Sequence, residues 1–146
     1  LKYYARGRMQ VAGDVRFLSG DLLQYLVILL DVTPKTRTKS QWTFLSVAQS
    51  IEFQDHAFYA PRPGYKGKSA CTLLRNPHIA RNEEILLDPY RPVEQMRKHY
   101  LGHLTDVVMV SSFMYAAERL GGADFDGDMV KTIADPIVNR LSRIHL

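Results

Sequence analysis

Three aspartates alternate with other residues inside a glycine-rich stretch near the C-terminal end of the chain. The stretch, residues 121–128, reads GGADFDGD and leads into the largely apolar residues 129–133. In an extended strand, side chains two residues apart share a face but lie about 6.6 Å apart, and in a helix such side chains diverge. The carboxylates can therefore approach one another only if the backbone curls, a conformation that Gly127 and the preceding glycine pair permit. The sequence predicts a curled loop followed by a buried strand.

This acidic loop has the composition of a metal site. Three like charges in one loop repel one another unless a cation neutralises them. Carboxylate oxygens, completed by water and phosphate oxygens, suit Mg²⁺, with Mn²⁺ as the alternative. Asp124, Asp126 and Asp128 are therefore candidate metal ligands, and we expect Phe125 to point away from them and anchor the loop in the core. A solvated acidic turn without metal is the simplest alternative.

Two better-known acidic motifs do not fit the loop. A calcium helix-loop-helix site has Gly at its sixth position and Glu at its twelfth, where this chain has Met129 and Asp135. Phosphatases with an aspartyl nucleophile need a threonine where Asp128 stands. Sugar-phosphate mutases have a similar metal loop of three aspartates and remain an alternative, although the chain has no phosphoserine-type loop upstream.

The rest of the chain mixes short β-prone runs with helical patterns, which predicts an α+β fold. Turn residues and alternation predict strands at residues 15–18, 69–74, 83–87, 105–110 and 129–133. Capping residues and apolar spacing predict helices over residues 22–30, 93–104 and from Pro136, and the pattern at 41–53 also favours a helix over a strand. The nearly all-apolar residues 22–30 predict a deeply buried helix.

Length and composition indicate one folded unit of ordinary size. The 146 residues are 46% hydrophobic and 23% charged, which is typical of a globular chain. The longest strongly apolar run, residues 22–30, falls short of the roughly 20 residues that span a membrane, so we expect no membrane helix. A single cysteine excludes an intrachain disulfide, and no signal segment is evident, so we expect a cytoplasmic protein. The formal charge of +4 suits polyanionic partners.

Several landmarks together resemble a known family. Residues 123–128 (ADFDGD) resemble the catalytic loop of the two-barrel RNA polymerases. These comprise the largest subunit of the multisubunit transcription enzymes and the cell-encoded RNA-dependent RNA polymerases. The upstream order is also similar: Gly67-Lys68, an apolar strand, residues 75–78 (RNPH), a second apolar strand, and residues 103–110 (HLTDVVMV). This order is more similar to the RNA-dependent enzymes and covers about residues 66–135.

The resemblance implies a fold and its limits. It implies a double-psi β-barrel, which we place at residues 61–146. Residues 1–60 match no part of the family, and we expect them to form a helical or mixed part whose helices pack beside the barrel. A break at residues 61–67 (PRPGYKG) lies at this boundary. The family's active site also needs a second barrel, for which 146 residues are too few. We therefore expect the chain to be part of a larger polymerase or to work with a partner chain.

The resemblance also implies an activity. Asp124, Asp126 and Asp128 would hold catalytic Mg²⁺, and Arg75 and Asn76 would bind the incoming nucleotide. The reaction would join nucleoside triphosphates on an RNA or DNA template and release pyrophosphate. A barrel that binds nucleic acid without catalysis is the alternative of a different class.

Overall fold

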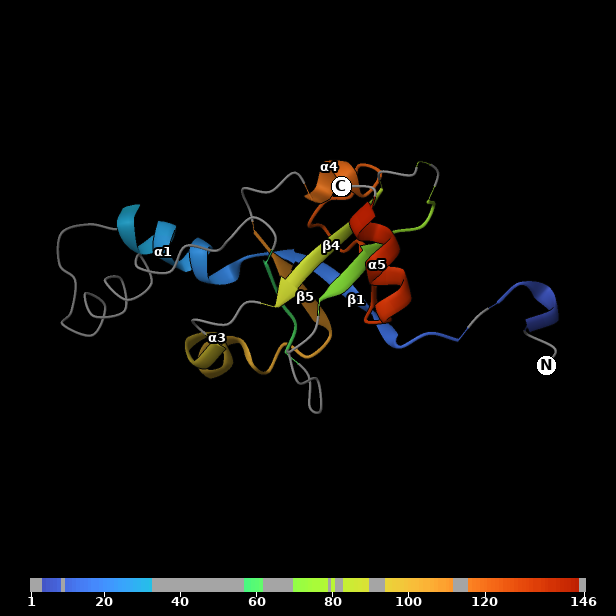
Figure 1. The fold of residues 1–146 in the computed structure, drawn as a ribbon. Coiled ribbons are helices and arrows are strands. Elements are labelled where there is room, and N and C mark those ends of the chain that lie inside the picture. The colour runs from blue at the N-terminus through green and yellow to red at the C-terminus, as the bar shows by residue number, and fades with distance from the viewer. Residues whose placement is uncertain are drawn as a thin grey trace.

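Six strands close into a barrel in the order β1-β5-β2-β4-β3-β6 (Figure 1). The computed structural model describes residues 4–8, 10–32, 57–61, 70–78, 80, 83–89, 94–111 and 116–144. The strands are β1 (Gly13–Gly20), β2 (Ala57–Tyr59), β3 (Cys71–Leu74), β4 (Glu84–Pro89), β5 (Val107–Val110) and β6 (Met129–Ile133).

The barrel contains two parallel and four antiparallel strand pairs. β1 runs parallel to β5 and β2 runs parallel to β4, while β2 and β5 are antiparallel. β6 is antiparallel to both of its neighbours, pairing Met129 with Phe17 of β1 and Lys131 with Leu74 of β3. β6 therefore closes the barrel and places the ends of β1 and β3 beside the segment that precedes it.

Helices lie at several places beside the strands. Within the described residues they are α1 (Leu22–Val32), α3 (Glu94–Leu101), α4 (Ala116–Arg119) and α5 (Pro136–Ile144), together with the 3₁₀ turn η1 (Tyr4–Arg6). In Figure 1, α5 lies over β3 and β4, whereas α1 extends away from the strands. Among the described residues, no helix is long and apolar enough to cross a membrane.

Apolar side chains fill the barrel interior. The main cluster draws on all six strands and on the segment from α4 into the acidic loop. Its members are Leu18, Phe58, Ala60, Cys71, Leu73, Ile85, Leu87, Val108, Val110, Ala116, Leu120, Ala123 and Val130. The packed interior supports the strands that carry the loop, because burial of this apolar surface is the main favourable term in folding.

Most predicted elements are confirmed. The five predicted strands correspond to β1 and to β3 through β6, and the three predicted helices correspond to α1, α3 and α5. Asp21 caps α1 by accepting from the Leu23 N–H at 3.1 Å, and Asp135 caps α5 in the same way. The helix expected over residues 41–53 lies outside the described residues, as does most of the break at 61–67.

The predicted limits of the barrel are wrong. β1 and β2 belong to residues 1–60, so the barrel is not confined to residues 61–146. The pairing of β1 with β5 and β6 joins distant parts of the chain, which local alternation does not reveal.

The predicted deep burial of α1 is also wrong. Leu23 is buried, but Tyr25, Ile28 and Leu29 are 58%, 53% and 40% exposed. The reason is visible in Figure 1, where α1 leaves the barrel after its first turn.

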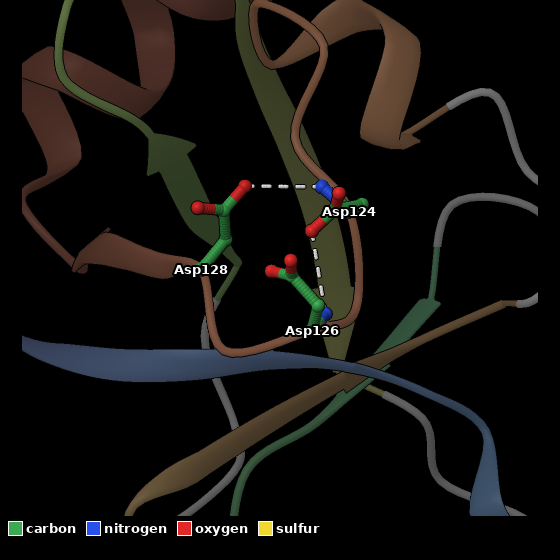
Figure 2. Close-up of side chains that lie close together, drawn as sticks. All are labelled: Asp124, Asp126 and Asp128. Atoms are coloured by element: carbon green, nitrogen blue, oxygen red, sulfur yellow. Dashed lines mark hydrogen bonds between the residues drawn. The ribbon is translucent and has the colours of Figure 1, made fainter.

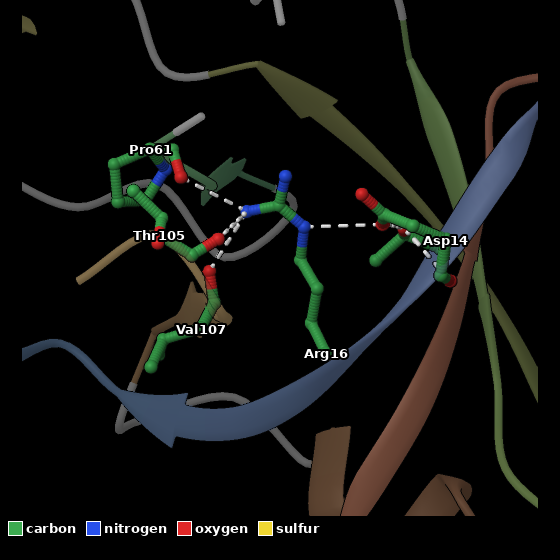
Figure 3. A network of polar contacts seen from close by, with 6 residues as sticks. Asp14, Arg16, Pro61, Thr105 and Val107 are labelled. Atoms are coloured by element: carbon green, nitrogen blue, oxygen red, sulfur yellow. Dashed lines mark hydrogen bonds and ion pairs between the residues drawn. The ribbon is translucent and has the colours of Figure 1, made fainter. Parts of the chain in front are cut away.

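A buried arginine joins three segments of the barrel. Arg16 on β1 is 2% exposed and donates through one terminal nitrogen to the backbone carbonyls of Pro61, Thr105 and Val107 at 3.1–3.2 Å (Figure 3). Its Nε pairs with Asp14 at 3.1 Å. Because a buried polar group without partners is costly, these bonds favour the arrangement in which β1, β5 and the end of β2 meet.

A second ion pair, buried on both sides, joins the capping residue of α1 to α3. Asp21 and Arg97 lie 2.6 Å apart, and both side chains are almost fully buried. We predict that Asp21→Asn, which keeps the capping oxygen but removes the charge, lowers the free energy of unfolding by about 3 kcal/mol. Urea denaturation followed by circular dichroism measures the change.

The control is Asp88→Asn, which alters an exposed aspartate on β4. Its effect should stay within about 0.5 kcal/mol. Equal stabilities for the two variants would contradict a structural role for the buried pair.

Candidate metal centre

The acidic loop, residues 121–128, is bonded to α4 at its start and to the barrel at its end. At its start, Gly122 N–H donates to the Glu118 carbonyl at 3.5 Å, at the end of α4. At its end, the Asp128 carbonyl accepts from Leu18 N–H of β1 at 2.8 Å, and β6 begins at the next residue. The fold therefore holds the loop above the junction of β1 and β6.

The loop curls as the sequence predicts. Gly121, Gly122 and Gly127 have φ angles of 67°, 70° and 130°, a region that residues with side chains rarely adopt. Positive φ at both ends of the acidic segment turns the chain back on itself. The predicted use of glycine is confirmed.

The curl brings the three carboxylates together. One oxygen each from Asp124, Asp126 and Asp128 lies within 4.8 Å of the others (Figure 2). Asp128 Oδ2 accepts from Asp124 N–H at 3.0 Å, and Asp124 Oδ1 accepts from Asp126 N–H at 3.3 Å. These bonds turn the side chains of Asp124 and Asp128 toward the centre of the loop.

The three oxygens would have to move inward to share one small hard cation. Mg²⁺ binds oxygen at about 2.1 Å in an octahedral shell, so neighbouring ligands lie about 3 Å apart and opposite ligands about 4.2 Å apart. Rotation of the aspartate side chains would supply this inward movement. Asp124 and Asp126 are exposed and Asp128 is half-buried, which leaves room for water or phosphate oxygens. Exposed acidic groups also gather in proteins without an ion, so the geometry alone makes this a candidate centre.

Two of the carboxyl groups differ in acidity. A hydrogen bond shared with the Asp124 side chain raises the pKa of Asp126, and the charge of Asp124 acts in the same direction. The Asp124 backbone N–H lowers the pKa of Asp128, and Arg75 adds to this effect. The two groups therefore respond to their neighbours in opposite directions.

Arg75, a predicted substrate-binding residue, lies at the loop. It follows β3, and its Nη2 lies 3.1 Å from both carboxylate oxygens of Asp128. Its Nη1 donates to the Gly121 carbonyl at 3.2 Å. The other predicted residue, Asn76, is exposed and makes no hydrogen bond to the three aspartates among the described contacts.

Two features of the loop differ from what the sequence predicts. Phe125 does not anchor it, because its side chain is 47% exposed. With the aspartates on either side turned inward, the residue between them is left outside, and Ala123 is the buried residue instead. The pairing of Arg75 with Asp128 was also missed, since no local signal links residues on separate strands.

Comparisons with known proteins add no family to this geometry. Neither the scan against protein-family models nor the search of curated proteins found a match to the chain.

The opposite pKa shifts can be measured directly. We predict that Asp126 titrates at a higher pH than Asp128 in a carboxyl-carbon NMR titration of the metal-free chain. Asp124→Asn removes the partner that raises the pKa of Asp126, so that pKa should fall. Because the variant keeps its backbone N–H, the pKa of Asp128 should stay low.

The higher pKa of Asp126 relative to Asp128 has a consequence for metal binding. As the pH falls, protons compete first for Asp126, so Mn²⁺ affinity should weaken before Asp128 is protonated. A pKa of Asp126 equal to or below that of Asp128 would contradict the observed arrangement of the loop.

Proposed function

We propose that this chain carries the Mg²⁺-binding barrel of a nucleotidyltransferase that makes RNA from nucleoside triphosphates on an RNA or DNA template. The observation that carries the proposal is the convergence of Asp124, Asp126 and Asp128 in a loop held by the barrel. The order of sequence landmarks around this loop supports the same assignment.

The three aspartates support nucleotidyl transfer as the proposed reaction. One metal held there would lower the pKa of the attacking 3′-hydroxyl, and a second metal would stabilise the leaving pyrophosphate. The three carboxylates would bind metal from one side, and their exposure leaves the other side open to a substrate. Mn²⁺ would be accepted by the same oxygen ligands.

Arg75 and Asn76 would bind the incoming nucleotide. The Arg75 guanidinium already lies against Asp128, and its planar fork of N–H donors matches phosphate oxygens. Asn76 is exposed at the next position. Both would therefore approach the substrate from the end of β3.

The barrel would act with a second one. β1 is parallel to β5, and β2 is parallel to β4, so the chain must cross over between the strands of each pair. These crossovers support a double-psi arrangement. In the proposed reaction a second barrel, from the remainder of a larger polymerase or from another chain, completes the active site. The isolated 146-residue chain would then be inactive.

Primer extension tests this proposal. A protein that contains this barrel and its flanking sequence should extend a primer on RNA or DNA with Mg²⁺ and nucleoside triphosphates. Mutation of residues that only hydrogen-bond to metal ligands typically lowers metal affinity or activity by about 10- to 100-fold. Asp126 is proposed as a direct ligand, so Asp126→Asn should reduce synthesis by more than about 100-fold. Its circular dichroism spectrum should be unchanged because Asp126 is exposed.

Asp88→Asn is the matched control, since it also neutralises one exposed aspartate. Normal synthesis by the Asp126→Asn protein would contradict the proposal. Nucleic-acid binding that survives replacement of all three aspartates, without synthesis, would favour a non-catalytic binding barrel, which the net charge of +4 suits. Phosphosugar turnover in a coupled assay would indicate the mutase-like alternative.

A further inference from the structure

Arg75 contacts both ends of the acidic loop. One terminal nitrogen donates to the carbonyl of Gly121, where the loop begins, at 3.2 Å. The other lies 3.1 Å from each oxygen of Asp128, where the loop ends. A single side chain from the end of β3 thus spans the loop that carries the three aspartates.

The guanidinium occupies oxygens that a metal ion would need. Both carboxylate oxygens of Asp128 lie within reach of Arg75, and Oδ2 also accepts from Asp124 N–H. Arg75 and Asp128 are 22% and 24% exposed, so the pair is partly shielded from water. Their attraction is therefore stronger than that of a fully exposed pair.

We propose that Arg75 is a stand-in cation: it holds Asp128 and the loop in place in the metal-free protein and withdraws from Asp128 when a divalent cation binds. The inference rests on the proposed metal site and adds a regulatory residue to it. Arg75 is a positioning residue here, because it acts on the metal through Asp128.

Two effects of Arg75 on metal binding oppose each other. Its positive charge repels a divalent cation, and its hydrogen bonds preorganise the loop. The loop also has its own hydrogen bonds and three glycines in the required conformation. Without Arg75 the loop should keep most of its conformation, while the repulsion of a divalent cation by the guanidinium is lost. Metal affinity should therefore rise.

Metal affinity of the 146-residue chain provides the first test. Mn²⁺ binding, followed by electron paramagnetic resonance of the free ion, is compared among wild type, Arg75→Gln and Arg75→Lys. Arg75→Gln should bind Mn²⁺ about 3- to 10-fold more tightly, because a nearby like charge is lost. Arg75→Lys keeps the charge and should stay within about twofold of wild type.

Arg140→Gln is the matched control, because Arg140 is an exposed arginine on α5. It should not change Mn²⁺ affinity. Unchanged or weaker binding by Arg75→Gln would overturn the inference. Equal gains in Arg75→Gln and Arg140→Gln would also overturn it, since they would reflect net charge alone.

Amide hydrogen exchange provides a second test that needs no metal. The Asp124 N–H donates to the carboxylate that Arg75 holds, so Arg75→Gln should speed its exchange several-fold in the metal-free chain. Mg²⁺ should restore protection in this variant. Exchange at the wild-type rate would overturn the loop-holding part of the inference.

The results also separate this inference from the proposed function. If wild type binds Mn²⁺, Asp126→Asn does not, and Arg75→Gln is no tighter, only the inference fails. If neither wild type nor Arg75→Gln binds Mn²⁺, the metal site fails and the inference fails with it. Binding by Arg75→Gln alone would support both.

Discussion

Closure of the barrel by β6 is the constraint on which the candidate site depends. β6 pairs with β1 on one side and with β3 on the other. The first pairing holds the Asp128 backbone against Leu18, and the second brings the end of β3, and with it Arg75, beside the loop. Leu18, Arg75 and Asp128 are distant in sequence, and they meet because β6 lies between β1 and β3.

The charge of the loop follows from this arrangement. Three carboxylates that approach within 4.8 Å raise the free energy of the fold unless positive groups compensate them. The loop uses two kinds of compensation, namely its own backbone N–H groups and the guanidinium of Arg75. A divalent cation would be a third kind, and it would compete with Arg75 for Asp128. The metal-free fold and the proposed metal-bound state are thus linked through one ion pair.

The sequence predicts the local parts of this structure well. Alternating apolar residues, caps and glycines identify five of the strands, three helices and the curl of the loop. The sequence does not predict the contacts between distant segments. Nothing near residues 15–18 indicates that β1 closes the barrel with β6, and a strand as short as β2 carries no pattern. Phe125 was misplaced because its apolar character suggests burial, whereas the position of its neighbours leaves it outside. The pairs of Arg75 with Asp128 and of Arg97 with Asp21 depend on the completed fold.

The central claim is that the three aspartates hold one divalent cation. A crystal structure of the chain grown with Mn²⁺, with anomalous scattering measured at the manganese edge, tests it most directly. The account predicts one strong anomalous peak at about 2.1–2.2 Å from oxygens of Asp124, Asp126 and Asp128, with Arg75 displaced from Asp128. A well-ordered loop without a peak, or a peak bound elsewhere on the chain, would contradict it.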